Sequence, residues 1–233
     1  MNIQQKAQID FQSNQMKHKD YFVDIELGKN CVLKKFLVKE NVLPPEKLTA
    51  IIWAKWIYEN KYLFKEKNIL DMGCGSGIQG ISALKSGATK VTFSDISKYE
   101  FENTNYNLEQ YNFKKNSKLF LGDLFEKINS KFDVILFNHP FFGVKPNKED
   151  FIALATQDDG KLIHRFFDEV KNYLNDFGII IMPFFDIAGE TNNPQIQAKK
   201  HDFLVEKVFS KNIETILHKG IISFYIIRLN NKR

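Results

Sequence analysis

The sequence predicts an α/β protein with a doubly wound, mostly parallel sheet. From residue 68 onward, short apolar runs alternate with amphipathic stretches of helical length. Strands and helices that alternate in this way form βαβ units, whose right-handed crossovers place helices on both faces of the sheet. The run GIIIMPF at residues 178–184 is apolar throughout, which is typical of a strand that is covered on both sides.

The composition is that of a globular domain. The chain has 233 residues, 43% hydrophobic and 26% charged, which is enough for one full core with a small extension. No stretch approaches the roughly 18 apolar residues of a membrane span, and the first residues are too polar for a signal peptide, so we expect no membrane partner and a cytoplasmic location. A net charge of +5 permits a nucleic-acid partner without demanding one. Cys31, Cys74 and the five scattered histidines lack metal-site spacing, so no metal is expected.

Three elements are expected before the regular alternation begins. Residues 1–20 are typical of a polar helix or a loose arm, and residues 21–38 alternate around a GKN turn as a β-hairpin does. After two prolines, KLTAIIWAKWIYEN has apolar residues at near-helical spacing. We therefore expect an N-terminal arm and hairpin over residues 1–44 and a main domain over residues 45–233.

The main domain is expected to contain seven strands. They lie in NILDMG, KVTFSDI, KLFLGDLF, FDVILF, GIIIMPF, the end of PQIQAKKHDFLVEKVF, and GIISFYIIRL. Helices are expected in IQGISALKSG, SKYEFENTNYNLEQYN, GKLIHRFFDEVKNYLNDFG and the start of PQIQAKKHDFLVEKVF, with a short helix around DFIALAT. Gly87 is suited to end the first of these helices, and Ser97 is suited to cap the second. Ligands of such sheets bind beyond the carboxyl ends of the strands, so the residues that end each strand indicate the chemistry.

The first strand ends in a glycine-rich loop, DMGCGSG at residues 71–77. Glycines there allow positive φ and a close approach of backbone to ligand, and the helix N-terminus that follows offers free N–H groups. The frame from Gly75 to Gly80 satisfies GxGxxG, a weak signal for a dinucleotide that a tight turn in an unrelated α/β protein also satisfies. Asp71 argues against a dinucleotide, because a carboxylate would repel its pyrophosphate. The same carboxylate suits a ligand that carries an ammonium group.

Carboxylates also end the next two strands. Asp95 lies about twenty residues past the glycines, where a carboxylate can accept hydrogen bonds from both hydroxyls of a ribose. The third strand ends in Gly122-Asp123-Leu124. There the aspartate suits the exocyclic amine of adenine, and the leucine suits the face of its ring.

These strand ends together resemble those of class I S-adenosylmethionine-dependent methyltransferases. The resemblance covers roughly residues 45–229 and rests on DMGCGSG, Asp95, GDLF and NHPFF. It implies a Rossmann-like fold whose antiparallel last strand, GIISFYIIRL, pairs beside strand five. It also implies S-adenosyl-L-methionine as the cofactor, with its methionine end and ribose at the first loop, its ribose at the second carboxylate and its adenine at the third. The residues that the resemblance assigns to the cofactor are Asp71, Gly73, Gly75, Gly77, Asp95, Asp123, Leu124 and Asn138.

The stretch NHPFF after the fourth strand resembles the (Asn/Asp)-Pro-Pro-(Tyr/Phe) motif of the amino-directed branch. That branch includes release-factor glutamine and rRNA or tRNA N-methyltransferases, which methylate planar nitrogens of low nucleophilicity. By this match, the Asn138 side-chain oxygen and the His139 carbonyl accept the two N–H hydrogens, Pro140 shapes the turn, and Phe141 stacks on the flat acceptor. Phe142 is expected to pack the loop. The methyl donor is already activated, so positioning suffices and no metal is required.

Several alternatives stay open at this point. His139 stands where the family most often has proline, and it is either a structural replacement or a group that touches substrate and accepts a proton. The acceptor is a planar amine or amide of RNA, DNA or protein, or a small molecule. A non-catalytic cofactor-binding module would not need the full set of Asp71, Asp95, Asp123 and Asn138. An NAD-dependent oxidoreductase conflicts with the acidic end of strand one and with NHPFF.

Overall fold

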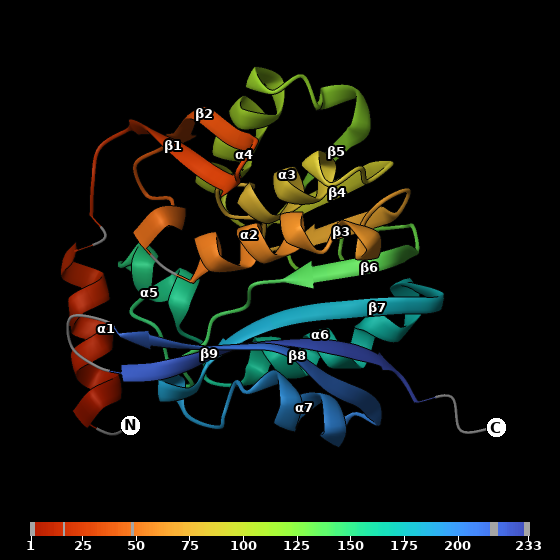
Figure 1. The fold of residues 1–233 in the computed structure, drawn as a ribbon. Coiled ribbons are helices and arrows are strands. Elements are labelled where there is room, and N and C mark those ends of the chain that lie inside the picture. The colour runs from red at the N-terminus through yellow and green to blue at the C-terminus, as the bar shows by residue number, and fades with distance from the viewer. Residues whose placement is uncertain (1–2, 16, 48, 215–218, 231–233) are drawn as a thin grey trace. The chain divides into compact units, whose positions relative to one another are not determined.

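The structure is a computed structural model that describes residues 3–15, 17–47, 49–214 and 219–230 (Figure 1). Its strands are β1 (Tyr21–Gly28), β2 (Cys31–Val38), β3 (Asn68–Met72), β4 (Lys90–Asp95), β5 (Ser117–Leu121), β6 (Phe132–Phe137), β7 (Leu174–Phe185), β8 (Phe203–Glu214) and β9 (Lys219–Leu229). Its α-helices are α1 (Ile3–Gln15), α2 (Ala50–Glu59), α3 (Ile78–Lys85), α4 (Lys98–Gln110), α5 (Phe151–Thr156), α6 (Lys161–Glu169) and α7 (Pro194–Lys200).

The strands form a hairpin sheet, β1-β2, and a seven-stranded sheet with the order β5-β4-β3-β6-β7-β9-β8. Short alternating strands and helices thus give the mostly parallel α/β fold that the sequence predicts. The chain divides into two compact units, residues 18–138 and residues 1–17 with 139–233, and each is described by itself. The boundary expected between residues 44 and 45 stays a prediction.

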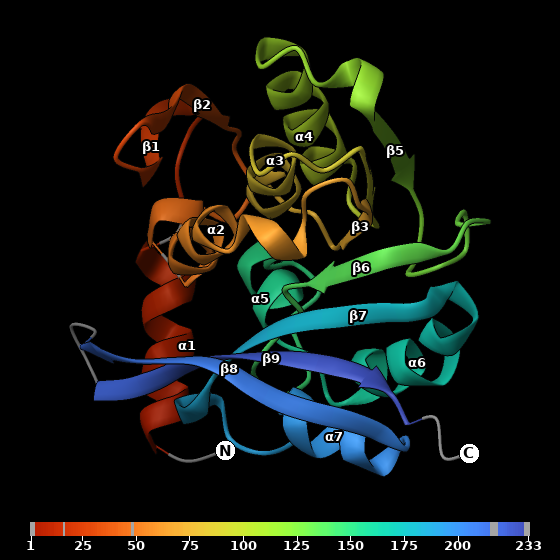
Figure 2. The same ribbon diagram turned by 45° about the vertical axis from the view of Figure 1, so that its right-hand side comes forward.

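In the unit of residues 18–138, β5, β4, β3 and β6 run parallel. Helix α3 packs on β3 and β4, α4 packs on β4 and β5, and α2 packs against α3 (Figure 2). Buried strand residues such as Ile69 and Phe93 fill the space beneath the helices, because apolar side chains gain free energy when they leave water. The helix caps follow the sequence, since Ser97 accepts a hydrogen bond at the start of α4 and Gly87 has a φ of +93° after α3.

The β1-β2 hairpin belongs to the same unit and is fastened to α4 by asparagine side chains. The Asn107 side chain accepts from the Leu37 N–H and donates to the Leu37 carbonyl, both at 3.0 Å. Asn103 Oδ1 accepts from the Lys39 N–H at 2.8 Å. These bonds satisfy backbone groups at the edge of β2 that would otherwise lack partners.

In the other unit, three long strands form the antiparallel part of the large sheet. Strand β9 pairs antiparallel with both β7 and β8, as in Ile181↔Ile226 and Val205↔Ile227. This confirms the antiparallel last strand beside strand five. Helix α7 packs on these strands, α6 packs against α7, and α1 packs against α5.

One predicted boundary is wrong. The stretch GKLIHRFFDEVKNYLNDFG was expected to be a single helix, but α6 ends at Glu169, a 3₁₀ turn covers Val170–Tyr173, and β7 begins at Leu174. Asn, Asp and Gly at positions 175, 176 and 178 favour the helix poorly.

Two general properties bear on function. None of the helices in the described ranges is long and apolar enough to cross a membrane. Over the same ranges, no group of three or more His, Cys, Asp and Glu side chains is placed to hold a metal ion.

Candidate active site

A glycine-rich loop joins β3 to α3, and three of its glycines have left-handed backbone. The φ angle is +59° at Gly73, +56° at Gly75 and +83° at Gly77, a region that other residues enter at a cost. A Cβ at Gly75 would have no neighbouring atom within 4 Å, so the loop is open to a ligand on that side. A Cβ at Gly77 would lie 2.9 Å from Thr104 Oγ1, so this glycine also lets α4 pack closely.

The Asp71 carboxylate ties the end of β3 to the start of α3. The residue is 1% exposed, and its Oδ2 accepts a hydrogen bond from the Gly80 N–H at 2.8 Å. Position 80 requires glycine, because a Cβ there would lie 2.2 Å from a ring carbon of Phe93. Burial raises the pKa of the Asp71 carboxyl well above its usual range, and the bond from Gly80 opposes that shift. The observed contact of Asp71 is structural, and its predicted role toward an ammonium group stays a prediction.

Asp95 at the end of β4 connects the first loop to α4. Its Oδ2 accepts from the Gly75 N–H and its Oδ1 from the Ser97 N–H, both at 3.0 Å. One residue earlier, the Ser94 carbonyl accepts from the Cys74 N–H at 3.1 Å. Burial raises the pKa of the Asp95 carboxyl, whereas the two backbone N–H groups favour its ionised form. The Ile96 N–H also bonds this carboxylate, whose two oxygens together offer about four lone-pair positions, so capacity for a hydroxyl donor remains.

The third loop is attached to the same end of β4. The Gly122 N–H donates to the Asp95 carbonyl at 2.9 Å, and the Ser94 hydroxyl donates to the Leu124 carbonyl at 3.4 Å. Leu124 has a φ of +44°, a conformation that costs a leucine on the order of 1–3 kcal/mol. Asp123 is half-buried beside it. Ser94 and Asp95 therefore join the glycine-rich loop and the Asp123 loop to the end of β4.

Two residues near Asp95 belong to this part of the structure although no pattern in the sequence analysis selected them. Ile96 is 72% exposed directly after the carboxylate, which is unusual for an isoleucine at the end of a buried strand. Glu100, in the first turn of α4, is 8% exposed, and burial together with the charge of Asp95 raises its pKa to about 7. The spacing Ser97-x-x-Glu100 is that of a helix capping box and could have drawn attention to Glu100.

Asn138 completes the set in this unit. Strand β6 pairs with β3 in the register Met72↔Phe137, so Asn138 and Gly73 follow at the same level of the sheet. The Phe137 ring lies 3.6 Å from the position of a Cβ on Gly73, and Asn138 itself is half-buried. The structure thus gathers the predicted cofactor residues along one sheet edge, as expected for the carboxyl ends of parallel strands.

The remaining NHPFF residues belong to the unit that contains residues 139–233, and His139 is fixed there by packing. It is 3% exposed, and its Nε2 lies 2.7 Å from the Asn192 carbonyl oxygen. A carbonyl only accepts, so Nε2 carries the hydrogen and donates it. The ring also stacks on Phe184, with 6.2 Å between centroids and 11° between planes. Of the two interpretations of His139, these contacts favour the structural one.

The two phenylalanines of the motif differ in exposure. Phe141 is half-buried and meets the edge of Phe184 with 5.6 Å between centroids, so part of its ring stays accessible. Phe142 is 3% exposed, in agreement with the expectation that it packs the loop. Its N–H donates to the Thr156 carbonyl at 3.0 Å, and its carbonyl accepts from the Asp158 N–H at 2.9 Å.

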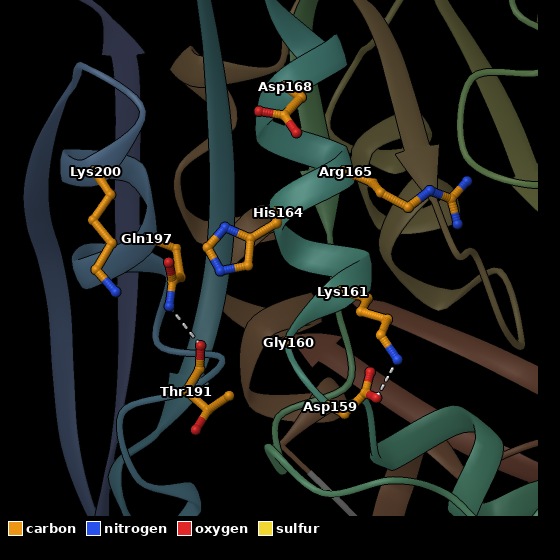
Figure 3. Close-up of a pocket in the computed structure, with 9 residues that line it drawn as sticks. All are labelled: Asp159, Gly160, Lys161, His164, Arg165, Asp168, Thr191, Gln197 and Lys200. Atoms are coloured by element: carbon orange, nitrogen blue, oxygen red, sulfur yellow. Dashed lines mark hydrogen bonds and ion pairs between the residues drawn. The ribbon is translucent and has the colours of Figure 1, made fainter.

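A pocket of about 580 Å³ lies between α6 and α7 (Figure 3). It is lined by Asp159, Gly160, Lys161, His164, Arg165, Asp168, Thr191, Gln197 and Lys200. Its charges are mixed, and Lys161 is already paired with Asp159 at 2.6 Å. None of the residues predicted from the strand ends lines it, so it is distinct from the predicted site.

Known proteins resemble the chain over most of its length. It is 34% identical over 134 residues to a Methanocaldococcus jannaschii protein provisionally named as a protein N5-glutamine methyltransferase, an alignment that covers 54% of this chain and 66% of the relative. It is 30% identical over 180 residues to the bifunctional methyltransferase of Rickettsia bellii, covering 71% of this chain and 31% of that protein. The chain therefore spans less than two thirds of each of these relatives.

A solved structure resembles the fold as a whole. The ribosomal protein L11 methylase of Lactobacillus delbrueckii subsp. bulgaricus superposes with a TM-score of 0.61, covering 90% of this chain and 99% of that one at 17% identity. At 17% sequence identity, this similarity shows only that the two proteins share a fold. The sequence model of the family described as methyltransferase small domain matches residues 57–184, which include β3 to β6 and the NHPFF stretch. The chain belongs to the methyltransferase small domain family.

Proposed function

We propose that the protein transfers a methyl group from S-adenosyl-L-methionine to a planar amine or amide nitrogen. The observation that carries the proposal is the junction at Ser94 and Asp95, which holds the glycine-rich loop and the Asp123 loop together at the sheet edge that Asn138 follows. Ligands of open α/β sheets bind at such an edge. Family membership supports the same reaction class.

The residues of this edge fit the cofactor. Open space beside Gly75 suits a close backbone approach by the ligand, and the spare lone pairs of Asp95 suit ribose hydroxyls. Ile96 and Leu124 would cover apolar faces of the adenine, and Asp123 would accept from its amine. The cofactor supplies, when bound, a methyl group activated by a sulfonium.

The acceptor is held by NHPFF. The lone pair of a planar nitrogen is delocalised into its ring or carbonyl, so the nitrogen must be oriented before it can react. The Asn138 side-chain oxygen and the His139 carbonyl accept its two hydrogens, which favours a pyramidal nitrogen with its lone pair free. The accessible part of Phe141 stacks on the flat group. No side chain has to act as a strong base, since the surplus proton can pass to solvent after transfer.

We propose a macromolecular acceptor, either RNA or protein. The names of the relatives support this class, because they include a ribosomal RNA large subunit methyltransferase, ribosomal protein L11 methyltransferases and the protein provisionally named as a protein N5-glutamine methyltransferase. The thiols of Cys31 and Cys74 are both free, which suits a reducing compartment, and we propose the cytoplasm as the place of the reaction.

A transfer assay with tritiated S-adenosyl-L-methionine tests the acceptor class. Total RNA, DNA, protein and metabolite fractions are offered separately, and we expect label in RNA or in protein. Label in the metabolite fraction alone would replace the macromolecular acceptor by a small molecule. Absence of label from all fractions, with cofactor binding intact, would favour a non-catalytic binding module.

Calorimetric titration tests the cofactor. S-adenosylhomocysteine is expected to bind saturably and NAD is expected not to bind. Saturable binding of NAD alone would overturn the proposed function and favour an oxidoreductase.

A further inference from the structure

Asn192 is a completely buried asparagine in the turn before α7, and its contacts converge on the NHPFF loop. Its exposed fraction is 0%. Its backbone carbonyl accepts from His139 Nε2 at 2.7 Å, and its side-chain Nδ2 donates to the Pro140 carbonyl at 3.0 Å and to the Asp158 carbonyl at 2.9 Å. One residue thus holds two successive residues of the loop from a position more than fifty residues further along the chain.

The chemistry of the site explains why the residue is asparagine. A side-chain amide has two N–H hydrogens, and here each goes to a different backbone carbonyl. Aspartate has the same shape but offers acceptors to those carbonyls, and leucine leaves both carbonyls unpaired. A buried carbonyl without a donor carries a desolvation penalty, so the loop would shift to recover a partner.

The opposite side of the loop is held by backbone alone. Phe142 exchanges hydrogen bonds with Thr156 and Asp158, and it forms a parallel bridge with Gln157. The Asn192 amide also donates to Asp158, so the same side chain joins the loop to the segment on its other side. The loop is thereby held at the His139 ring, at the Pro140 carbonyl and at both backbone groups of Phe142.

We propose that Asn192 is a positioning residue for methyl transfer, which rests on the function proposed above. It holds the His139 ring and the Pro140 carbonyl, and thereby the turn that directly follows Asn138 in the chain. It so sets the direction in which the acceptor nitrogen is held. It touches neither cofactor nor acceptor. Its loss therefore lowers kcat, while the affinity for S-adenosylhomocysteine, whose proposed contacts are mostly with residues 71–124, stays close to that of wild type.

The test compares Asn192→Asp with Asn193→Ala, using whichever fraction, total RNA or total protein, the wild-type protein labels. Asn193 caps α7 through a bond from the Gln195 N–H at 2.9 Å, so its loss weakens the same turn without removing a bond to the loop. We expect Asn192→Asp to lower kcat on the order of 100-fold with unchanged affinity for S-adenosylhomocysteine, the size of effect that a small misplacement produces. Asn193→Ala should keep kcat within about twofold of wild type. A kcat for Asn192→Asp within twofold of wild type, or an equal fall in both variants, overturns the proposal.

A measurement on the wild-type protein guards against a variant that fails to fold. The side-chain amide hydrogens of Asn192 are both bonded and buried, so nuclear magnetic resonance should show them exchanging with solvent far more slowly than those of exposed Asn147. Exchange at the rate of an exposed amide overturns the proposal. Failure of the proposed function can be distinguished from failure of the Asn192 role alone. In the first case the wild-type protein itself labels no fraction, and the positioning role falls with the function. In the second case the wild-type protein labels a fraction and Asn192→Asp does so equally well.

Discussion

Asn138 and His139 are neighbours in the chain with opposite surroundings. Asn138 follows β6 and keeps part of its side chain accessible, whereas the His139 ring is packed against Phe184 and bonded to Asn192. The accessible Asn138 side chain can face a ligand, while the buried His139 ring anchors the turn. The two positions should therefore respond differently to substitution.

The substitution Asn138→Ala removes the proposed acceptor of the substrate N–H hydrogens. We expect kcat to fall on the order of 10²–10³-fold, as for the loss of one positioned hydrogen-bonding group. Binding of S-adenosylhomocysteine should change far less, because Asn138 is only one of several predicted cofactor residues. Steady-state methyl-transfer kinetics and calorimetry measure the two quantities. An Asn138→Ala protein with wild-type kcat would remove this residue from the mechanism.

The substitution His139→Gln separates the two interpretations of the histidine. Glutamine also has an N–H donor for the Asn192 carbonyl but has no group that titrates near neutral pH. We expect activity to be retained and the dependence of kcat on pH to match that of wild type, with His139→Ala costing about 1–3 kcal/mol of stability. Loss of one limb of the pH profile in His139→Gln would instead identify the imidazole as a proton acceptor.

Sequence patterns predict single residues well only where the signal is local. Asp71, Asp95 and Asp123 stand at strand ends, and strand ends can be located from apolar runs. Asn192 could not be predicted, because the carbonyls it serves belong to Pro140 and Asp158, which are distant in the chain. Ile96 gave no signal either, since its meaning depends on its exposure rather than on its type.

At the level of elements, the β3–loop–α3 unit has two glycines with different physical roles. Gly80 allows α3 to lie against β4, with no room for a methyl group beside Phe93, whereas Gly75 has free space and a positive φ. Both positions fall within one GxGxxG pattern. The sequence alone does not show which of its glycines is needed for packing and which for contact with a ligand. The structure assigns the packing role to Gly80.

The matched pair Gly80→Ala and Gly75→Ala tests this division. Gly80→Ala should destabilise the fold by about 3 kcal/mol or more, the upper end of overpacking costs, because a Cβ would lie 2.2 Å from a Phe93 ring carbon. Thermal or denaturant unfolding measures this loss. Gly75→Ala should cost only about 1–2 kcal/mol of stability through its left-handed backbone, and it should weaken S-adenosylhomocysteine binding by calorimetry. Equal stability of the two variants would contradict the packing role of Gly80.

Element boundaries, like single residues, can be predicted only where the local sequence carries a clear signal. The parallel strands and their helices could be predicted because each buries a periodic apolar face. The end of α6 could not be placed, because Leu174 and Phe177 continue an apolar pattern into a segment that the structure makes part of β7. Phe177 is 96% exposed, so the apolar residue that extended the predicted helix is not in the core at all.

For the molecule as a whole, a buried acid near the carboxyl ends of the parallel strands couples its stability to pH. Glu100 has a pKa of about 7, raised from 4.5 by burial and by Asp95. Because the folded state holds this proton more tightly than the unfolded state, the stabilisation is fully present below pH 4.5 and is lost as pH rises through about 7. At 1.36 kcal/mol per unit, this group alone lowers the free energy of unfolding by about 3 kcal/mol between those limits.

The substitution Glu100→Gln removes that dependence. We expect a higher free energy of unfolding than wild type at pH 8, by up to about 3 kcal/mol, and little difference at pH 4. Glu102→Gln is the matched control on the same helix, since Glu102 is exposed and its pKa is lowered by Lys39, so its substitution should slightly reduce stability at pH 8. Denaturant unfolding at both pH values measures the difference, and parallel curves for Glu100→Gln and wild type would contradict the assignment.

The bond from His139 to Asn192 also limits how the specificity of this protein can be engineered. NHPFF is a short continuous motif, so replacing its five residues by the motif of another family member is the obvious way to change the proposed acceptor preference. The loop is built from three separate stretches of chain, with residues 156–158 and 192 supplying the groups that fix it. All three stretches must therefore be exchanged together. Replacing the five residues alone would change the sequence of the motif without the hydrogen-bonding groups that determine its backbone conformation.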